Sequence, residues 1–125
     1  MNNLIIDAAN DKIFFKIMAD KKSYTSEIIN NRENFDKLTI LIIKFLKNHD
    51  LNIKNLSNIF VNQGPGKFSG IRASIAIAKA LSITNKLNLY GFNSSDLKDM
   101  RYENVFNLYE KGMLTKNLIN PVYSS

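Results

Sequence analysis

Several features that carry chemistry in other proteins are missing from this chain of 125 residues. There is no cysteine, which excludes disulfides, thiolate zinc sites and a cysteine nucleophile. The spacing around the single histidine, His49, suggests no Ser-His-Asp catalytic triad. At the end of a predicted helix, its imidazolium would interact favourably with the helix C-terminus. We predict no catalytic, cofactor-binding or metal-ligating residue.

Long apolar runs are also absent. Ile40 to Ile43 is among the longest, far short of the roughly 20 residues that span a membrane. Asp7 interrupts the apolar stretch Leu4 to Ile6 near the N-terminus, so no secretory signal is visible. We therefore expect a cytoplasmic protein that has no membrane partner.

Acidic residues are fewer than basic ones, with 11 Asp and Glu against 17 Lys and Arg, which gives a net charge of +6. Clustered basic residues indicate a nucleic-acid partner, because they neutralise phosphates. Fourteen of these residues are lysines, however, and they are spread along the chain with only Lys21 and Lys22 adjacent. Abundant Lys, Asn and Ile also share AT-rich codons, so mutational bias is the alternative explanation that we favour.

The alternation and composition of the first 30 residues predict three strands, at Leu4–Ala8, Lys12–Met18 and Ser23–Ile29. Asn and Asp residues separate them by hairpin-length gaps, which favours an antiparallel meander. Beyond them the apolar spacing becomes helical over Glu33–Lys47, with Asn30 or Asn31 as the N-cap.

The order of the remaining elements decides the fold class. Strands at Ser57–Asn62 and Leu87–Phe92 flank a helix at Gly70–Ile83, which gives the order β-β-β-α-β-α-β. This order predicts an α/β fold, a single actin-like or ribonuclease-H-like domain with a mixed five-stranded sheet and helices packed on it. Asn93–Met100 and Asn104–Lys111 are predicted as short helices. We assign residues 1–100 to this domain and residues 101–125 to a residual C-terminal helix and tail packed on it.

Nine residues between a predicted strand and helix, GPGKFSGIR, form the most specific motif. Pro65 fixes its own φ and restricts Gly64, and Gly66 is expected to take positive φ, so the strand ends in a tight turn. Ser69 is predicted to cap the next helix, and Gly70 to let it approach a neighbouring segment closely. The free N–H groups there would suit an anion, and a purely structural turn is the alternative.

The loop matches neither common nucleotide-binding motif. A P-loop would need Gly at position 61 and Ser or Thr at position 68, where Val61 and Phe68 stand. The glycines are spaced two and four apart, one residue too many for the dinucleotide fingerprint GxGxxG.

GPGKFSGIR resembles the loop GPGSFTGxR of the TsaB (YeaZ) family, with Lys67 in place of Ser and Ser69 in place of Thr. The opening Leu4 to Ala9 resembles the first strand of that family, LAIDTA, with Ala8 replacing Thr. Asn120 to Tyr123 is similar to its C-terminal PVYLR. The family-loop residues are Gly64, Pro65, Gly66, Lys67, Phe68, Ser69, Gly70 and Arg72. Most of the family's second domain has no counterpart here.

The resemblance implies a non-catalytic scaffold subunit in the synthesis of tRNA threonylcarbamoyladenosine, next to the anticodon. Its partner would be the TsaD-like catalytic subunit, in a heterodimer, with a TsaE-like ATPase as a further partner. Contact with tRNA is expected to be indirect or weak. The alternatives are a minimal actin-like phosphotransferase or glycoprotease-like enzyme, and a homodimeric remnant that pairs through the same helices.

The two long helices support a partner without any appeal to family. Gly70–Ile83 is apolar nearly all round apart from Arg72 and Lys79, so one sheet face cannot cover its whole surface. Burial under the C-terminal tail is the alternative. The predicted interface residues are Phe35, Leu38, Ile42, Phe45, Ile71, Ser74, Ile75 and Ala78.

Asp7, at the end of the first strand, has two interpretations. Actin-like ATPases place a carboxylate there, near a metal-bound nucleotide, but the accompanying hydroxyl is replaced by Ala8. We favour a structural or capping role. Lys67 and Arg72 flank the loop, where they would suit phosphate or an acidic partner, although exposed basic residues often have no specific role.

Overall fold

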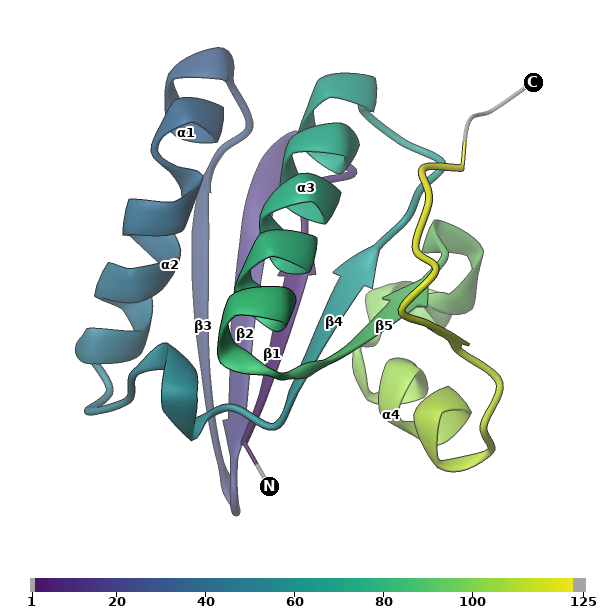
Figure 1. The fold of residues 1–125 in the computed structure, drawn as a ribbon. Helices are drawn as coiled ribbons and strands as arrows, with labels where there is room; N and C mark the ends of the chain where they lie inside the picture. The colour runs from purple at the N-terminus through teal and green to yellow at the C-terminus, as the bar shows by residue number, and fades with distance from the viewer. Residues whose placement is uncertain (1, 123–125) are drawn as a thin grey trace.

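A computed structural model of the chain describes residues 2–122. Its centre is a six-stranded mixed sheet with the order β3-β2-β1-β4-β5-β6 (Figure 1). The strands are β1 (Asn2–Asp7), β2 (Lys12–Ala19), β3 (Lys22–Ile29), β4 (Asn58–Asn62), β5 (Asn88–Phe92) and β6 (Thr115–Lys116).

The first three strands form the predicted antiparallel meander. β1 pairs with β2 so that Ile5 lies opposite Lys16, and β2 pairs with β3 so that Lys16 lies opposite Thr25. The turn between β2 and β3 contains Asp20 at φ 54°, a conformation that Asp tolerates better than most residues. β3 forms one edge of the sheet.

Two helical crossovers then place β4 parallel to β1 and β5 parallel to β4. The first crossover contains α1 (Arg32–Asp36), α2 (Leu38–Lys47) and the 3₁₀ turn η1 (Ile53–Asn55); the second is α3 (Phe68–Asn85). These crossovers confirm the predicted α/β class. The sheet differs by one strand, because β6 is only two residues long and leaves no alternating pattern in the sequence.

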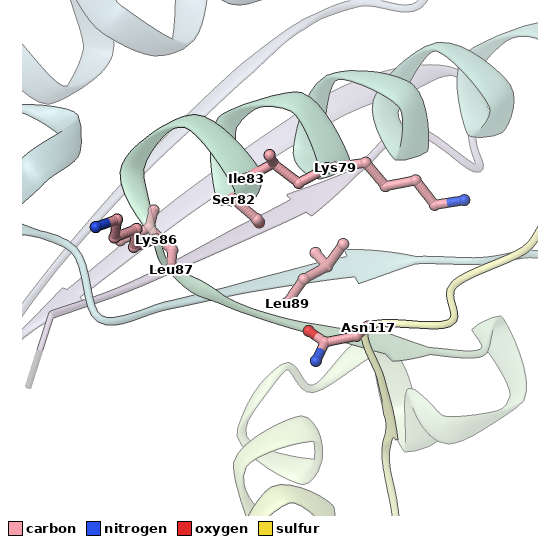
Figure 2. A pocket seen from close by; sticks show the side chains of 7 residues that line it. All are labelled: Lys79, Ser82, Ile83, Lys86, Leu87, Leu89 and Asn117. Atoms are coloured by element: carbon pink, nitrogen blue, oxygen red, sulfur yellow. The ribbon is translucent and has the colours of Figure 1, made fainter.

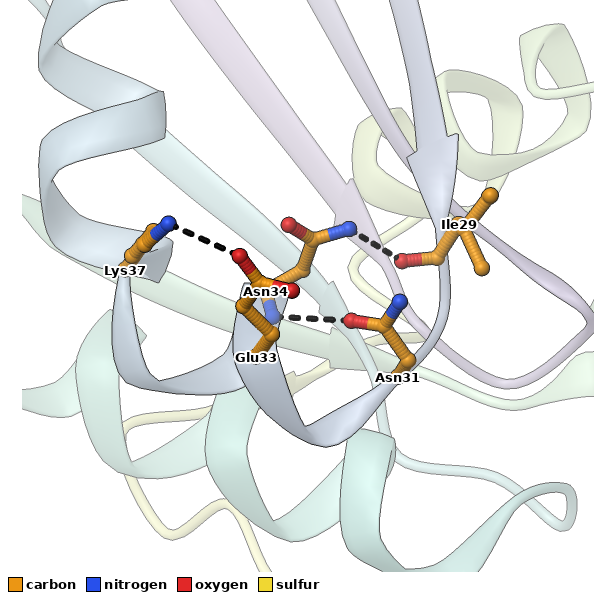
Figure 3. Close-up of polar contacts among 5 residues, drawn as sticks. All are labelled: Ile29, Asn31, Glu33, Asn34 and Lys37. Carbon is orange, nitrogen blue, oxygen red and sulfur yellow. Dashed lines mark hydrogen bonds and ion pairs between the residues drawn. The ribbon is translucent and has the colours of Figure 1, made fainter.

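The helix predicted over residues 33–47 is broken at Lys37. Its backbone leaves helical geometry at φ −104° and ψ 7°, which separates α1 from α2. Asn31 caps α1, as predicted, by accepting a hydrogen bond from the backbone N–H of Asn34 at 2.9 Å (Figure 3). The Asn34 side chain donates to the carbonyl of Ile29 at 2.7 Å, which ties α1 to the end of β3.

The two faces of the sheet are covered by different elements (Figure 1). Leu4 and Ile6 of β1 point to the large core beneath α2 and α3, whereas Ile5 points to the opposite face. There it packs in a smaller core with residues that include Phe60, Phe92 and Val105. Val105 belongs to α4 (Glu103–Glu110), which follows the turns η2 (Ser94–Asp96) and η3 (Lys98–Met100).

None of the helices in residues 2–122 combines the length and the apolar character that crossing a membrane requires.

Candidate functional site

The loop after β4 turns through Gly64. This glycine has φ +106°, and a Cβ there would lie 2.6 Å from the carbonyl oxygen of Val122. We predicted a positive φ at Gly66, and this prediction is wrong, because Gly64 has the positive φ and Gly66 does not. Glycine is needed at position 66 for space, because a Cβ would lie 2.5 Å from the carbonyl oxygen of Ala9. The loop is therefore pressed against the segment that follows β1.

The helix after the loop begins at Phe68, earlier than predicted. Lys67 is its N-cap residue and has no capping side-chain bond, so the predicted cap at Ser69 is wrong. Ser69 lies exposed inside the first turn, where its hydroxyl is past the capping position. Gly70 is buried against Ala8 and the Asn30 side chain, which confirms the predicted close approach.

Basic side chains beside the loop have local partners. The ammonium of Lys67 lies 3.0 Å from a carboxylate oxygen of Asp11, and the backbone N–H of Lys67 donates to the carbonyl of Ala9. The guanidinium of Arg72 lies over the ring of Phe68, 5.1 Å from its centroid. An ion pair this exposed contributes little free energy, but it gives Lys67 a partner within the chain.

Asp7 occupies the carboxyl end of β1, beside the ends of β4 and β5, where ligands bind in many open α/β sheets. The residue as a whole is 2% exposed. One oxygen accepts hydrogen bonds from the Ala9 backbone at 3.1 Å and the Asn62 amide at 3.0 Å. The other accepts from the Tyr102 hydroxyl at 2.7 Å. Side chains and backbone of this chain therefore pair both carboxylate oxygens.

Tyr102, which donates to Asp7, comes from the C-terminal segment of the chain. Its ring stacks on Phe14 of β2, with centroids 4.5 Å apart and an angle of 6° between the planes. Burial raises the pKa of the Tyr102 phenol above its ordinary value, and the nearby charge of Asp7 raises it further. The phenol thus remains the protonated donor that the carboxylate requires.

Asn62 connects Asp7 to the loop. Its side-chain oxygen accepts from the backbone N–H of Gly64 at 2.8 Å, and the Ser94 hydroxyl donates to the carbonyl of Pro65 at 2.8 Å. The Asn62 amide also lies 3.1 Å from the Ser94 hydroxyl. We call Asp7, Asn62, Ser94 and Tyr102 the strand-end network; sequence reasoning proposed only Asp7 from this set.

His49 packs as an aromatic residue just beyond α2. Its ring stacks on Tyr24 at a centroid distance of 3.9 Å and meets the edge of Phe45 at 5.3 Å. These contacts hold the end of α2 against β3.

The predicted interface side chains lie almost entirely inside the protein. Phe35 is partly buried, and the exposed fractions of the other seven do not exceed 6%. They are Leu38, Ile42, Phe45, Ile71, Ser74, Ile75 and Ala78. The interface residues therefore need correction, because side chains packed in their own core are inaccessible to a second protein.

The opposite flank of the same helices is exposed and partly apolar. Ile40 and Ile43 of α2 are 56% and 40% exposed. Between these helices and η1 lies an apolar groove of about 290 Å³. The residues that line this groove are Ile43, Leu46, Lys47, Asn52, Ile53, Leu81 and Asn85. We call the groove and the exposed isoleucines of α2 the helical face.

A second depression, of about 480 Å³, lies between the other side of α3 and the β5–β6 edge (Figure 2). Ile83, Leu87 and Leu89 form its apolar part, and Lys79 and Lys86 of the α3 region extend away from it at its margins. Ser82 and Asn117 complete its lining, and none of its lining residues belongs to the strand-end network.

Comparison with known proteins decides the family. Residues 28–98 match the family model of TsaD, described as tRNA N6-adenosine threonylcarbamoyltransferase. Over 91 residues the chain is 33% identical to tRNA threonylcarbamoyladenosine biosynthesis protein TsaB of Buchnera aphidicola subsp. Schizaphis graminum (strain Sg). The chain belongs to the TsaB (YeaZ) family. Its loop Gly64 to Arg72 lies within the part that the TsaD family model matches.

Solved structures of YeaZ and RuvC share the fold of this TsaB-family chain. YeaZ from Pseudomonas aeruginosa superposes with a TM-score of 0.72 over 89% of this chain, at 14% identity. Thermus thermophilus RuvC, solved with a Holliday junction substrate, superposes with a TM-score of 0.59 over 93% of this chain, at 7% identity. At such identities the likeness concerns the fold alone.

The TsaB-family chain is shorter than its relatives. It covers 43% of the Buchnera protein and 50% of the Pseudomonas YeaZ chain, whereas it covers 99% of the RuvC chain. Of the similarity noted at the C-terminus, Tyr123 lies outside the described residues.

Proposed function

We propose that this chain acts in the synthesis of tRNA threonylcarbamoyladenosine as a non-catalytic subunit that binds and supports a TsaD-like catalytic subunit. The name of the Buchnera relative and the match to the TsaD family model support the pathway. In this proposal a TsaE-like ATPase supplies ATP hydrolysis, and contact of this chain with tRNA is weak or indirect. The protein then works in the cytoplasm, where tRNA is modified.

The strand-end network is the observation that carries the non-catalytic part. Ligands of open α/β sheets bind at the carboxyl ends of the strands, where Asp7 lies, so a catalytic Asp7 would have to be free to contact substrate or metal. Here Asp7 is 2% exposed and already accepts hydrogen bonds from three groups of its own chain. Such an arrangement favours a structural role, because exchanging these partners for a ligand would leave buried donors unpaired.

The helical face supports the partner-binding part. Exposed Ile40 and Ile43 adjoin an apolar groove, and this combination is typical of a surface that receives a helix from another protein. Docking of the TsaD-like subunit here would remove these apolar groups from water, at about 25 cal/mol per Å² of buried apolar surface.

Co-purification with the TsaD-like subunit of the same organism tests the proposal. We expect the wild-type chain to co-purify and Ile43→Lys to lose the complex, because an ammonium would enter the apolar groove. Ile75→Lys would be uninformative, since Ile75 is 3% exposed and the substitution would unfold the core.

Ile29→Lys is the matched control, because Ile29 is 65% exposed but lies on β3, outside the helical face. Both variants should keep the wild-type circular dichroism spectrum. Absence of a complex with the wild-type chain at low salt contradicts the proposal, as does an equal loss in both variants.

Thermal unfolding with ATP and Mg²⁺ tests the enzyme alternative separately. A ligand that binds only the folded state raises the melting temperature. We expect no change in melting temperature, and a concentration-dependent rise would argue for a nucleotide-binding enzyme.

A further inference from the structure

The helical face combines its apolar groove with an unusual charge pattern. Asp50 is the only carboxylate between residues 37 and 95, a stretch that contains α2, η1 and α3. The same stretch contains seven lysines and Arg72. Asp50 itself lines a separate depression with Lys21 and Lys22 at the β2–β3 turn. The groove therefore has basic neighbours and no acidic residue in its lining.

One lysine lines the groove, and two more directly follow lining residues in the sequence. Lys47 contributes to its lining, Lys44 follows Ile43 on α2, and Lys54 follows Ile53 in η1. All three are exposed, and within residues 2–122 none of them forms an ion pair. Lys37, by contrast, is paired with Glu33 at 3.1 Å one turn before this surface (Figure 3). The positive charge of these three lysines is thus not neutralised by an ion pair within residues 2–122.

We propose that the occupant of this groove is an amphipathic helix of a partner protein whose apolar stripe is flanked by Asp and Glu. The apolar stripe would enter between α2 and α3, and the flanking carboxylates would meet Lys44, Lys47 and Lys54. This inference rests on the proposed function and names the chemistry that its partner must present.

Two other occupants fit less well. A second copy of this chain would bring the lysines of one groove against those of the other, which is electrostatically unfavourable. RNA-binding surfaces use Arg and exposed aromatic rings to stack bases. This groove instead has isoleucine and leucine between lysines, and the one arginine of the stretch, Arg72, lies over Phe68.

Two synthetic helical peptides with one apolar stripe test the proposal. Both carry leucine at positions i, i+3, i+4 and i+7, and the remaining positions are Glu in one peptide and Lys in the other. By fluorescence anisotropy with the full chain, we expect the Glu peptide to bind roughly tenfold or more tightly at low salt. Screening by salt should reduce that difference.

Charge reversal locates the effect. Lys44→Glu combined with Lys47→Glu should invert the preference toward the Lys peptide. Lys98→Glu combined with Lys111→Glu is the matched control, because it changes the net charge equally in η3 and after α4, elements outside the helical face. The control pair should keep the wild-type preference.

Equal binding of the two peptides, or no binding of the Glu peptide, overturns the inference. An equal loss of the preference for the Glu peptide in both double variants also overturns it. The same holds if tRNA binds the wild-type chain and only the Lys44/Lys47 reversal abolishes that binding. Failure of the proposed function is distinguishable: a chain that selects the Glu peptide but does not co-purify with the TsaD-like subunit retains the surface and loses the function. Conversely, a salt-independent complex that tolerates the reversal retains the function and refutes the acidic helix.

Discussion

The hydrogen bond between Tyr102 and Asp7 joins residues 95 positions apart in the sequence. It brings the C-terminal segment onto the end of β1, and the stacked Phe14 ring fixes the orientation of the phenol. A buried carboxylate that loses a donor keeps its desolvation penalty. This one contact therefore stabilises the closed arrangement of the strand-end network.

Tyr102→Phe tests that contact. The variant keeps the ring on Phe14 but removes the donor to Asp7, so we expect the free energy of unfolding to fall by about 1–3 kcal/mol. Urea unfolding followed by circular dichroism at neutral pH measures the change. Tyr109→Phe is the control, because the Tyr109 ring packs on Phe60 while its hydroxyl has no hydrogen bond in residues 2–122. Equal effects in the two variants would contradict the assigned role.

The same residue predicts an alkaline pH dependence. Below pH about 10 the phenol is protonated in both the folded and the unfolded chain. Since the folded-state pKa of Tyr102 is raised, the unfolded chain loses its proton first and wild-type stability falls as the pH rises further. The stability difference between wild type and Tyr102→Phe should therefore narrow above pH about 10. A difference that is constant between pH 8 and 11 would contradict this.

The sequence indicated one member of the strand-end network and missed the others for a physical reason. Asp7 follows an apolar strand, so its position at a strand end was visible. Tyr102 lies in a segment without clear periodicity, and its meeting with Asp7 depends on the path of the chain after β5. Asn62 and Ser94 are equally ordinary in sequence, and only the fold brings them together.

At the scale of elements, α1 depends on its ends. With five residues it is too short to be stable alone, so it relies on its cap and on Phe35, which packs against the core. Asn31 and Asn34 form the two hydrogen bonds that hold its first turn (Figure 3).

Asn31→Ala should lower the free energy of unfolding by about 0.5–2 kcal/mol, because it removes the N-cap acceptor. Asn107→Ala is the control: Asn107 is exposed within α4, where alanine is the better helix former. Chemical denaturation of both variants measures the difference. If Asn107→Ala lowers the free energy of unfolding as much as Asn31→Ala does, loss of the N-cap is not the cause of the effect.

Most elements could be predicted from periodicity, and the exceptions have local causes. The predicted strands and long helices match the structure closely, because the central strands β1 and β4 are buried and strongly apolar, and β2 and β3 alternate in exposure. The break at Lys37 follows no Pro or Gly and so left no signal. The segment of α3 is apolar nearly all round, so its sequence does not show which flank faces the sheet, and this is why Ile75 and its neighbours were assigned to a partner.

At the scale of the whole molecule, the sheet has a core on each side and α4 covers the smaller one. The division into residues 1–100 and a packed tail stays a prediction. If the tail is part of the same cooperative unit, a cavity in either core should weaken the entire protein.

Ile42→Ala in the large core and Val105→Ala in the small core test this, since both residues are fully buried. We expect a single unfolding transition in each variant, with a loss of about 2–5 kcal/mol for Ile42→Ala and a smaller loss for Val105→Ala. Far-ultraviolet circular dichroism and tyrosine fluorescence should give the same midpoint. Separate midpoints in Val105→Ala would show that α4 unfolds independently.

The scarcity of carboxylates between residues 37 and 95 would also affect how quickly the protein meets the acidic partner that we propose. Ten of its eleven acidic residues lie outside that stretch, which holds eight basic residues and one aspartate. An acidic surface would attract this basic stretch before contact. Electrostatic steering of this kind raises association rate constants by roughly 10-fold to 10³-fold. Productive encounters would then begin with α2 and α3 already facing the partner.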